Sequence, residues 1–146
     1  MAVETYSGQV LTIAQQKGGA GKTTFAAQLA ATFAKQGLTV GMIDIDPQGS
    51  LTLWSQARKD RFRKNVDILI IDSPPHAESE AKIAIRAADL VLVPLQPSPM
   101  DLWACKPTFD LAENESTELY VVLNRVDSRT KLTGQMTEKL GQLDVK

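Results

Sequence analysis

Nine residues near the start of the chain decide the fold: Gln16-Lys17-Gly18-Gly19-Ala20-Gly21-Lys22-Thr23-Thr24. They follow an apolar run at residues 10–14 and precede an apolar helical pattern that begins near residue 23. A strand, a glycine-rich loop and a helix in this order are the context that a phosphate-binding loop requires. The alternative is a flexible loop with two solvated lysines, and the flanking strand and helix favour phosphate binding over it.

Each residue type in this loop suits a separate task in phosphate binding. Glycines let the backbone turn its N–H groups toward an anion, and the helix behind them adds the positive end of its dipole. Lys22 supplies a charge for the outer phosphates, and the hydroxyl of Thr23 is suited to the magnesium ion that bridges them. We therefore expect nucleotide binding from the whole loop: Lys17, Gly18, Gly19, Ala20, Gly21, Lys22, Thr23 and Thr24.

The loop departs from the pattern G-x-x-x-x-G-K-[ST] at its first position and holds an unusual residue at its second. Gln16 takes the place of the first glycine, and the next position holds an additional lysine, Lys17. A lysine followed by Gly-Gly-x-Gly-Lys-Thr resembles the deviant Walker A motif of the ParA/MinD family of ATPases. The departure therefore points to one group of P-loop proteins.

The composition indicates one globular domain without a strong overall charge. The chain has 146 residues, of which 43% are hydrophobic and 23% charged, and its formal net charge is −1. These values are ordinary for a soluble domain, so any contact with nucleic acid needs a local basic patch. One basic run could contact DNA phosphates, although a solvated helix face is the favoured interpretation: Arg58, Lys59, Arg61, Arg63 and Lys64.

Cysteine usage and apolar runs indicate the compartment. Cys105 is the single cysteine, so it cannot form an internal disulfide, and we expect a small buried hydrophobe there. The first residues do not resemble a secretion signal, and the apolar runs are only long enough for strands. We therefore expect a cytoplasmic protein with no membrane partner.

Three other conspicuous residues receive structural interpretations. His76 is the one histidine of the chain and has no partner for a metal site, so we expect it to be solvated. Trp54 and Trp103 occur at helical spacing with other apolar residues, which favours the core over a recognition role.

Apolar runs alternate with helical patterns along the chain. The expected strands are residues 10–14, 39–46, 66–71, 90–95 and 119–124, and the expected helices begin near residues 23, 50, 78, 101 and 131. We expect Gly37 to end the first helix and Pro107 to kink or restart the fourth. Continuously apolar strands that alternate with helices indicate a three-layer, doubly wound α/β fold with a mainly parallel sheet.

Polar residues end several of these strands. Asp44 and Asp46 end the second strand, Asp72 follows the third, and Asn124 ends the fifth. In an open parallel sheet, ligands bind at the carboxyl ends of the strands, so these residues should gather beside the glycine-rich loop. Each also has a structural interpretation, because carboxylates often end strands and Asp72 or Asn124 could belong to a turn.

Three further segments resemble the ParA/MinD family. Residues 44–49 look like its switch I segment, residues 71–75 like its Walker B and switch II region, and residues 94–103 like a stretch typical of its ParA branch. The resemblance implies an ATPase that binds Mg-ATP, dimerises around it, hydrolyses it slowly and drives the partition of plasmid or chromosomal DNA. It also implies an adaptor partner, ParB-like or centromere-binding, with non-specific DNA as a further candidate partner.

The resemblance implies a catalytic set of Lys17, Lys22 and Asp46. Lys17 would reach across a nucleotide-sandwich dimer to the partner's phosphates, where a cation can stabilise transferred charge as an arginine finger does. Asp46 would position or activate the attacking water.

The resemblance also implies the ligands of magnesium and adenine. Thr23 would hold the magnesium ion, and Asp72 would orient it through water. Asp44 would contact the ligands of the ion and not the ion itself. Asn124 would meet the adenine base.

Two parts that the family would lead us to expect are missing from this sequence. A further strand and helix would be expected between the switch I and Walker B segments, and another strand with terminal helices would be expected beyond the last residues. Loss of an edge strand leaves the order 2-3-1-4-5 and its right-handed crossovers intact. We therefore expect a single domain, residues 1–146, without those parts. The alternative function is a truncated or minimal P-loop core that folds and binds nucleotide but is catalytically inactive.

Overall fold

The computed structural model describes residues 8–45, 66–75 and 78–143. Asp46, Trp54, His76, the basic run at residues 58–64 and the helix expected from residue 50 lie outside the described residues. In chain order the described elements are β1 (Gln9–Ile13), α1 (Lys22–Lys35), β2 (Val40–Asp44), β3 (Ile68–Asp72), α3 (Glu78–Arg86), β4 (Leu90–Leu95), α4 (Pro99–Asn114), β5 (Glu118–Leu123) and α5 (Lys131–Gln142).

The five strands form one parallel sheet in the order β2-β3-β1-β4-β5. This order confirms the sequence prediction. β1 lies in the middle and pairs with β3 on one side and β4 on the other. The register places Ile13, the last residue of β1, beside Asp72, and it places Asp72 beside Asp44 of β2. Two of the predicted strand-end carboxylates are therefore neighbours.

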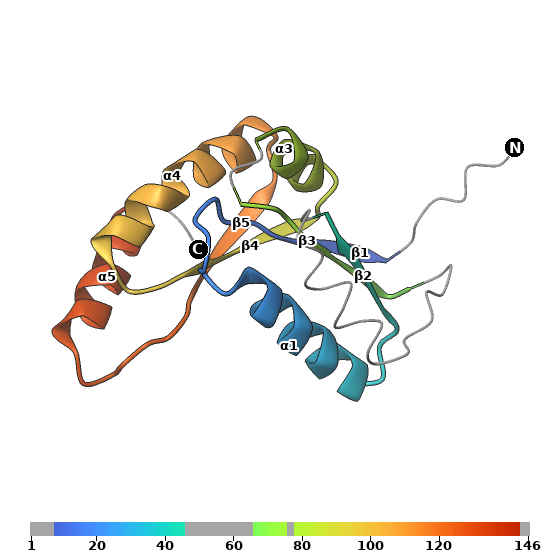
Figure 1. Cartoon of the computed structure of the whole chain (residues 1–146), viewed down its shortest axis with the longest axis horizontal. Helices are drawn as coiled ribbons and strands as arrows, with labels where there is room; N and C mark the ends of the chain where they lie inside the picture. The colour runs from blue at the N-terminus through green and yellow to red at the C-terminus, as the bar shows by residue number, and fades with distance from the viewer. Residues whose placement is uncertain (1–7, 46–65, 76–77, 144–146) are drawn as a thin grey trace, which may run out of the picture.

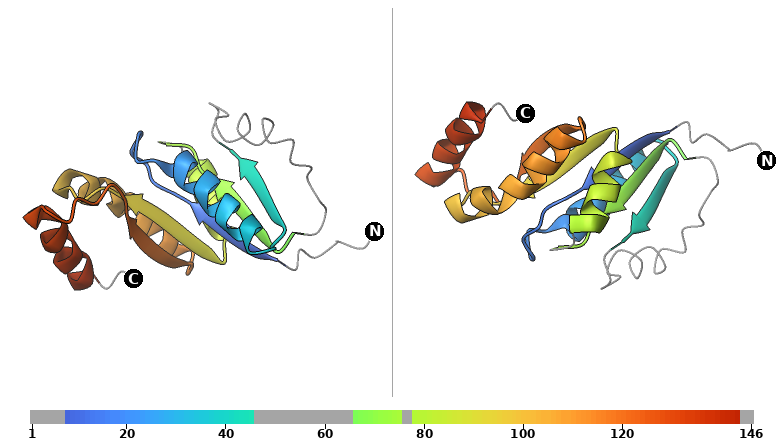
Figure 2. Two further views of the ribbon diagram at one scale, coloured as in Figure 1. Left: turned by 90° about the horizontal axis from the view of Figure 1, so that it is seen from below. Right: turned by 90° about the horizontal axis from the view of Figure 1, so that it is seen from above.

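Helices cover both faces of the sheet (Figures 1 and 2). α1 packs on one face, where Ala26 and Ala30 join a core cluster with residues of β1, β2 and β3. α3 and α4 cover the other face, and their buried residues form a second cluster with β4. α5 contributes Met136 and Leu140 to that second cluster. The arrangement confirms the three-layer α/β fold.

β4 explains why the strands of this sheet are continuously apolar. Leu90 and Leu92 pack against the cluster under α1, whereas Val91, Val93 and Leu95 belong to the cluster under α3 and α4. Because side chains alternate across a strand and both faces are covered, every position needs an apolar residue.

α1 ends as its sequence predicts. Gly37 has a φ of 88°, its N–H donates to the carbonyl of Ala34 at 3.1 Å, and the N–H of Leu38 donates to the carbonyl of Phe33 at 3.2 Å. These two bonds form a Schellman motif, in which a left-handed residue follows the helix. The prediction that Gly37 caps the helix is confirmed.

α4 corrects two sequence predictions. It is one continuous helix that begins at Pro99, so Pro107 neither interrupts nor restarts it, whereas a kink at Pro107 stays a prediction. Proline removes one N–H from the helix, and here Pro107 and Trp103, whose carbonyl loses that N–H, are both exposed, so water can satisfy the carbonyl. Trp103 was expected in the core, but its side chain is 70% exposed.

Within residues 8–45, 66–75 and 78–143, no helix combines the length and apolar character that crossing a membrane requires.

Candidate phosphate-binding site

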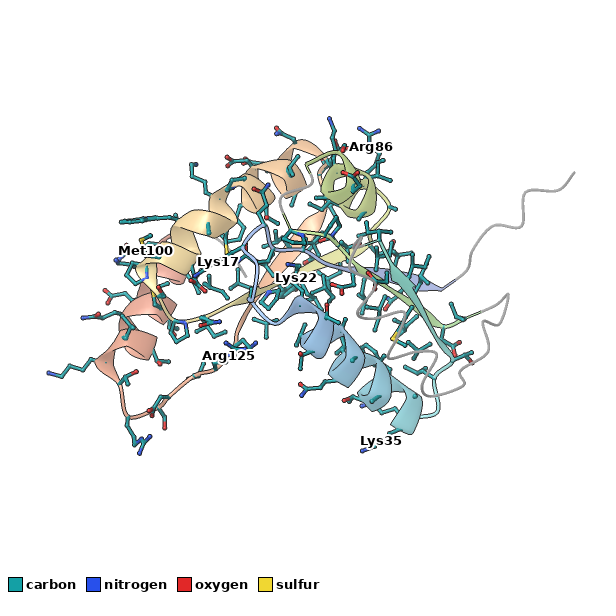
Figure 3. The ribbon with its side chains drawn as sticks, in the orientation of Figure 1. Lys17, Lys22, Lys35, Arg86, Met100 and Arg125 are labelled. Carbon is teal, nitrogen blue, oxygen red and sulfur yellow. The ribbon has the colours of Figure 1, made fainter. Side chains whose placement is uncertain are left out.

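The glycine-rich loop leaves the sheet between the ends of β3 and β4, because β1 lies between those strands. Figure 3 shows Lys22 at the start of α1 and Lys17 on the side of the loop that faces the N-terminal end of α4. The site is therefore built by β1, α1, β3 and α4, which come from distant parts of the chain.

Backbone conformation in the loop depends on glycine at two positions. Gly19 and Gly21 have φ values of 75° and 88°, in the left-handed region that residues with a Cβ rarely adopt. Gly21 is the N-cap of α1, and its carbonyl accepts the N–H of Phe25 at 2.9 Å. A Cβ on Gly21 would lie 2.9 Å from Nδ2 of Asn124, so the loop and the end of β5 can approach closely only because this residue is glycine.

A hydroxyl and a carboxylate meet beside the loop. The Oγ1 of Thr23 donates to Oδ2 of Asp72 at 2.6 Å, and Asp72 is 1% exposed. Asp44 lies beside Asp72 in the register of β2 and β3. Oxygen ligands of this kind are those that magnesium prefers, so the donor set fits the ion that the sequence predicts here. Among the described residues, no group of three or more histidine, cysteine or carboxylate side chains is arranged to hold a metal ion by itself.

The two lysines of the loop lie in different environments. Lys22 is 7% exposed at the first position of α1, whereas the side chain of Lys17 is 45% exposed. The Nζ of Lys17 forms an ion pair with Oδ1 of Asp101, which lies in the first turn of α4 and is 2% exposed. The pairing of Lys17 with its own subunit was not expected from the sequence.

A second contact joins the loop to α4. The Nε2 of Gln15 donates to the Sγ of Cys105, and the Oε1 of Gln15 accepts the N–H of Lys17 at 3.3 Å. Asp101 and Cys105 are four residues apart, so they lie one turn apart on the same side of α4. Burial raises the pKa of the Cys105 thiol to about 11; the hydrogen bond from Gln15 opposes this rise.

Asn124 follows β5 and holds it against the loop. Its Nδ2 donates to the carbonyl of Ala20 at 3.4 Å, its N–H donates to the carbonyl of Leu95 at 2.7 Å, and its Oδ1 accepts the N–H of Arg125 at 2.9 Å. The structure therefore places Asn124 at the predicted edge of the sheet. Its role toward adenine stays a prediction.

The structure brings together the loop, Asp44, Asp72 and Asn124, while Asp46 lies outside the described residues. The site contacts of Asp101 and Gln15 were not predicted from the sequence. Gln15 follows directly on β1, and Asp101 follows the loop after β4, so both occupy the edge where ligands bind in such sheets. Their positions after central strands are the signal that could have found them.

A parallel sheet of this order, with a glycine-rich loop between β1 and α1, defines the P-loop class of nucleotide-binding proteins. Residues 11–145 match the family described as CobQ/CobB/MinD/ParA nucleotide binding domain. The chain therefore belongs to this family, which confirms the resemblance seen in its loop.

Two relatives illustrate the family. Maintenance of carboxysome distribution protein A from Halothiobacillus neapolitanus is 28% identical over 162 residues, a match that covers 92% of this chain and 74% of the relative. Protein ParA from Rhizobium radiobacter is 35% identical over 112 residues, and the match covers 63% of this chain and 50% of the relative. The second match thus spans only half of the ParA protein.

Two solved structures share the fold. A complex of a Cyanothece McdA variant with ATP has a TM-score of 0.80 at 19% identity and covers 96% of this chain and 80% of its own. Cobyrinic acid a,c-diamide synthase from Mycobacterium smegmatis, with bound ADP and magnesium, has a TM-score of 0.76 at 21% identity and covers 92% and 81%. At these identities the likeness concerns the fold.

Gly21→Ala is expected to lower the free energy of unfolding by about 1–3 kcal/mol, because alanine in the left-handed region is strained and its Cβ would press on Asn124. Urea unfolding followed by circular dichroism measures the change. Gly18→Ala is the matched control, since its Cβ would meet no atom within 4 Å and its φ is not positive. Equal stability of the two variants would contradict the role given to Gly21.

Cys105 is expected to resist alkylation in the folded protein. With a pKa of about 11, roughly one thiol in a thousand is ionised at pH 8, and burial excludes the reagent as well. Treatment with iodoacetamide at pH 8, followed by intact-mass measurement, should give the unmodified mass for native protein and a single adduct after denaturation in urea. Rapid modification of the native protein would contradict this environment.

Proposed function

We propose that the chain binds Mg-ATP, forms a homodimer around two ATP molecules, hydrolyses them slowly and uses the change between dimer and monomer as a switch in DNA partition. The observation that carries this proposal is the hydrogen bond between Thr23 and Asp72 at the mouth of the glycine-rich loop. It places a hydroxyl and a carboxylate together where the loop amides and Lys22 would hold the phosphates.

The residues of the loop divide the work of binding. Backbone N–H groups of residues 18–23 hold the phosphates, and Lys22 neutralises them from a largely buried position where its charge is less screened by water. Magnesium, when bound, neutralises developing phosphate charge; Thr23 would hold it, with Asp72 and Asp44 orienting its water ligands. Asn124 is the proposed contact of the adenine base.

Two residues are proposed to act on the transferred phosphoryl group. Lys17 reaches from one subunit into the site of the other, where its ammonium group stabilises the transition-state charge. Asp46 orients the attacking water. The γ-phosphate would stabilise the dimer over the monomer, and its loss on hydrolysis would remove that stabilisation. The bound nucleotide would therefore determine whether the protein is a dimer or a monomer.

The proposed cargo follows from the relatives. One relative is named Protein ParA, and another is named for the maintenance of carboxysome distribution. We propose plasmid or chromosomal DNA as the cargo, with a ParB-like or centromere-binding adaptor and non-specific DNA as partners. The second candidate is a P-loop core that binds nucleotide but stays a monomer, and the ion pair of Lys17 with Asp101 of its own subunit favours it. Light-scattering mass with and without Mg-ATP distinguishes the two.

Lys22→Ala is expected to abolish detectable binding of Mg-ATP in titration calorimetry, because a buried charge that faces the phosphates is lost. Lys35→Ala is the matched control on the same helix, since Lys35 is exposed in the last turn of α1 and should leave binding unchanged. Retention of wild-type affinity by the Lys22 variant would exclude the loop as the phosphate site.

Lys17→Ala is expected to bind Mg-ATP but to remain a monomer and to lose turnover by about a thousandfold, as the loss of an arginine finger does. Sedimentation velocity reports the mass, and release of inorganic phosphate reports the rate. Lys106→Ala serves as control, because it removes an exposed lysine of α4. Unchanged turnover in the Lys17 variant would refute the role in the partner's site.

A further inference from the structure

Asp101 is a buried carboxylate whose charge is directed at Lys17. It is 2% exposed, its Oδ1 is paired with the Nζ of Lys17, and its Oδ2 has no hydrogen-bond partner among the described residues. A buried carboxylate needs a counter-charge because it has lost its hydration. Its place in the first turn of α4 adds the favourable end of the helix dipole. Lys17 is therefore held firmly on its own subunit.

The side chain of Lys17 is open to solvent beside its ion pair with Asp101. This side chain is 45% exposed, so solvent and any second molecule can reach it from the other side. On the proposed function, the ammonium group leaves the buried carboxylate of its own subunit to reach the phosphates of another. The two positions of Lys17 are therefore alternatives.

We propose that Asp101 is a positioning residue that holds Lys17 back, and that opening of this ion pair sets the ATP concentration at which the protein dimerises. The inference rests on the proposed function of Lys17. In the absence of ATP, release of Lys17 would leave the Asp101 charge buried and uncompensated, which opposes the dimer. ATP bound on a second copy offers Lys17 another anion and shifts the balance, because it interacts with Lys17 in the dimer alone.

Gln15 and Cys105 give this device a fixed support. Gln15 contacts both the backbone of Lys17 and the thiol of Cys105. The backbone of Lys17 therefore stays against α4 whether or not its ammonium group is released. The rearrangement therefore involves the side chain of Lys17 and not the docking of the loop on α4.

The test uses the full chain and measures dimer fraction by sedimentation velocity across a series of ATP concentrations with magnesium. Asp101→Asn keeps the shape of the side chain but removes its charge, and it should lower the ATP concentration at half-dimerisation at least about tenfold. Asp101→Glu keeps the charge and should stay within about threefold of the wild type. Asp110→Asn is the matched control, since it removes a surface ion-pair carboxylate of the same helix and should change nothing.

Epistasis with Lys17 separates positioning from a structural role. Adding Asp101→Asn to Lys17→Ala should leave the protein a monomer at every ATP concentration, because the group that Asp101 restrains is gone. Dimers of the double variant would show that Asp101 acts other than through Lys17. Asp101→Ser gives the same expectations and replaces the asparagine variant if that variant fails to fold by circular dichroism. An unchanged or raised ATP requirement in Asp101→Asn, with wild-type protein that dimerises on ATP, overturns this inference and leaves the proposed function standing. Wild-type protein that binds no ATP or remains a monomer overturns both.

Discussion

The pairing of β1 with strands on both sides is the constraint on which this site depends. β1 lies between β3 and β4, so the loop that follows it emerges where the carboxyl ends of those strands are nearest. From β3 comes Asp72, which accepts the hydroxyl of Thr23, and after β4 comes α4 with Asp101. A sheet of another order would leave the same motifs in the sequence but would separate their side chains. The strand order therefore brings the glycine-rich loop together with the side chains that complete the candidate phosphate-binding site.

Local features of the fold were predictable because few residues determine each of them. The loop between a strand and a helix is such a feature, and Gly37 after an apolar helix is another, since only a left-handed residue completes the Schellman motif. The continuous apolar runs also predicted a parallel sheet covered on both faces, and both faces of β4 pack against a core cluster. The strand order needed the resemblance to the ParA/MinD family, because alternation alone is compatible with several orders.

The contacts of α4 could not be predicted from its pattern. Its buried stripe consists of Asp101, Cys105, Thr108 and Ala112, in which two of four residues are polar. The spacing of apolar residues therefore predicted the wrong buried face for this helix and placed Trp103 in the core. Pro107 lies on the outward side, where loss of one N–H is harmless. Asp101 is polar within that stripe because its partner is Lys17, which is 84 residues away and reaches it only in the folded sheet.

The magnitudes decide whether an ion pair of this kind can regulate assembly. Removing one partner of a buried pair costs about 3–5 kcal/mol, and the 45% exposure of Lys17 brings the cost here toward or below the low end of that range. ATP also binds the monomer in the proposed scheme, so only the contact that it makes in the dimer alone, with Lys17 of the other subunit, can shift the equilibrium. In that scheme each subunit opens one ion pair of Lys17 and forms another contact between Lys17 and an anion, so the two terms are of similar size. On the proposed function, the hold of Asp101 on Lys17 is thus of the size needed to oppose the dimer without ATP and to be overcome by ATP bound on a second copy.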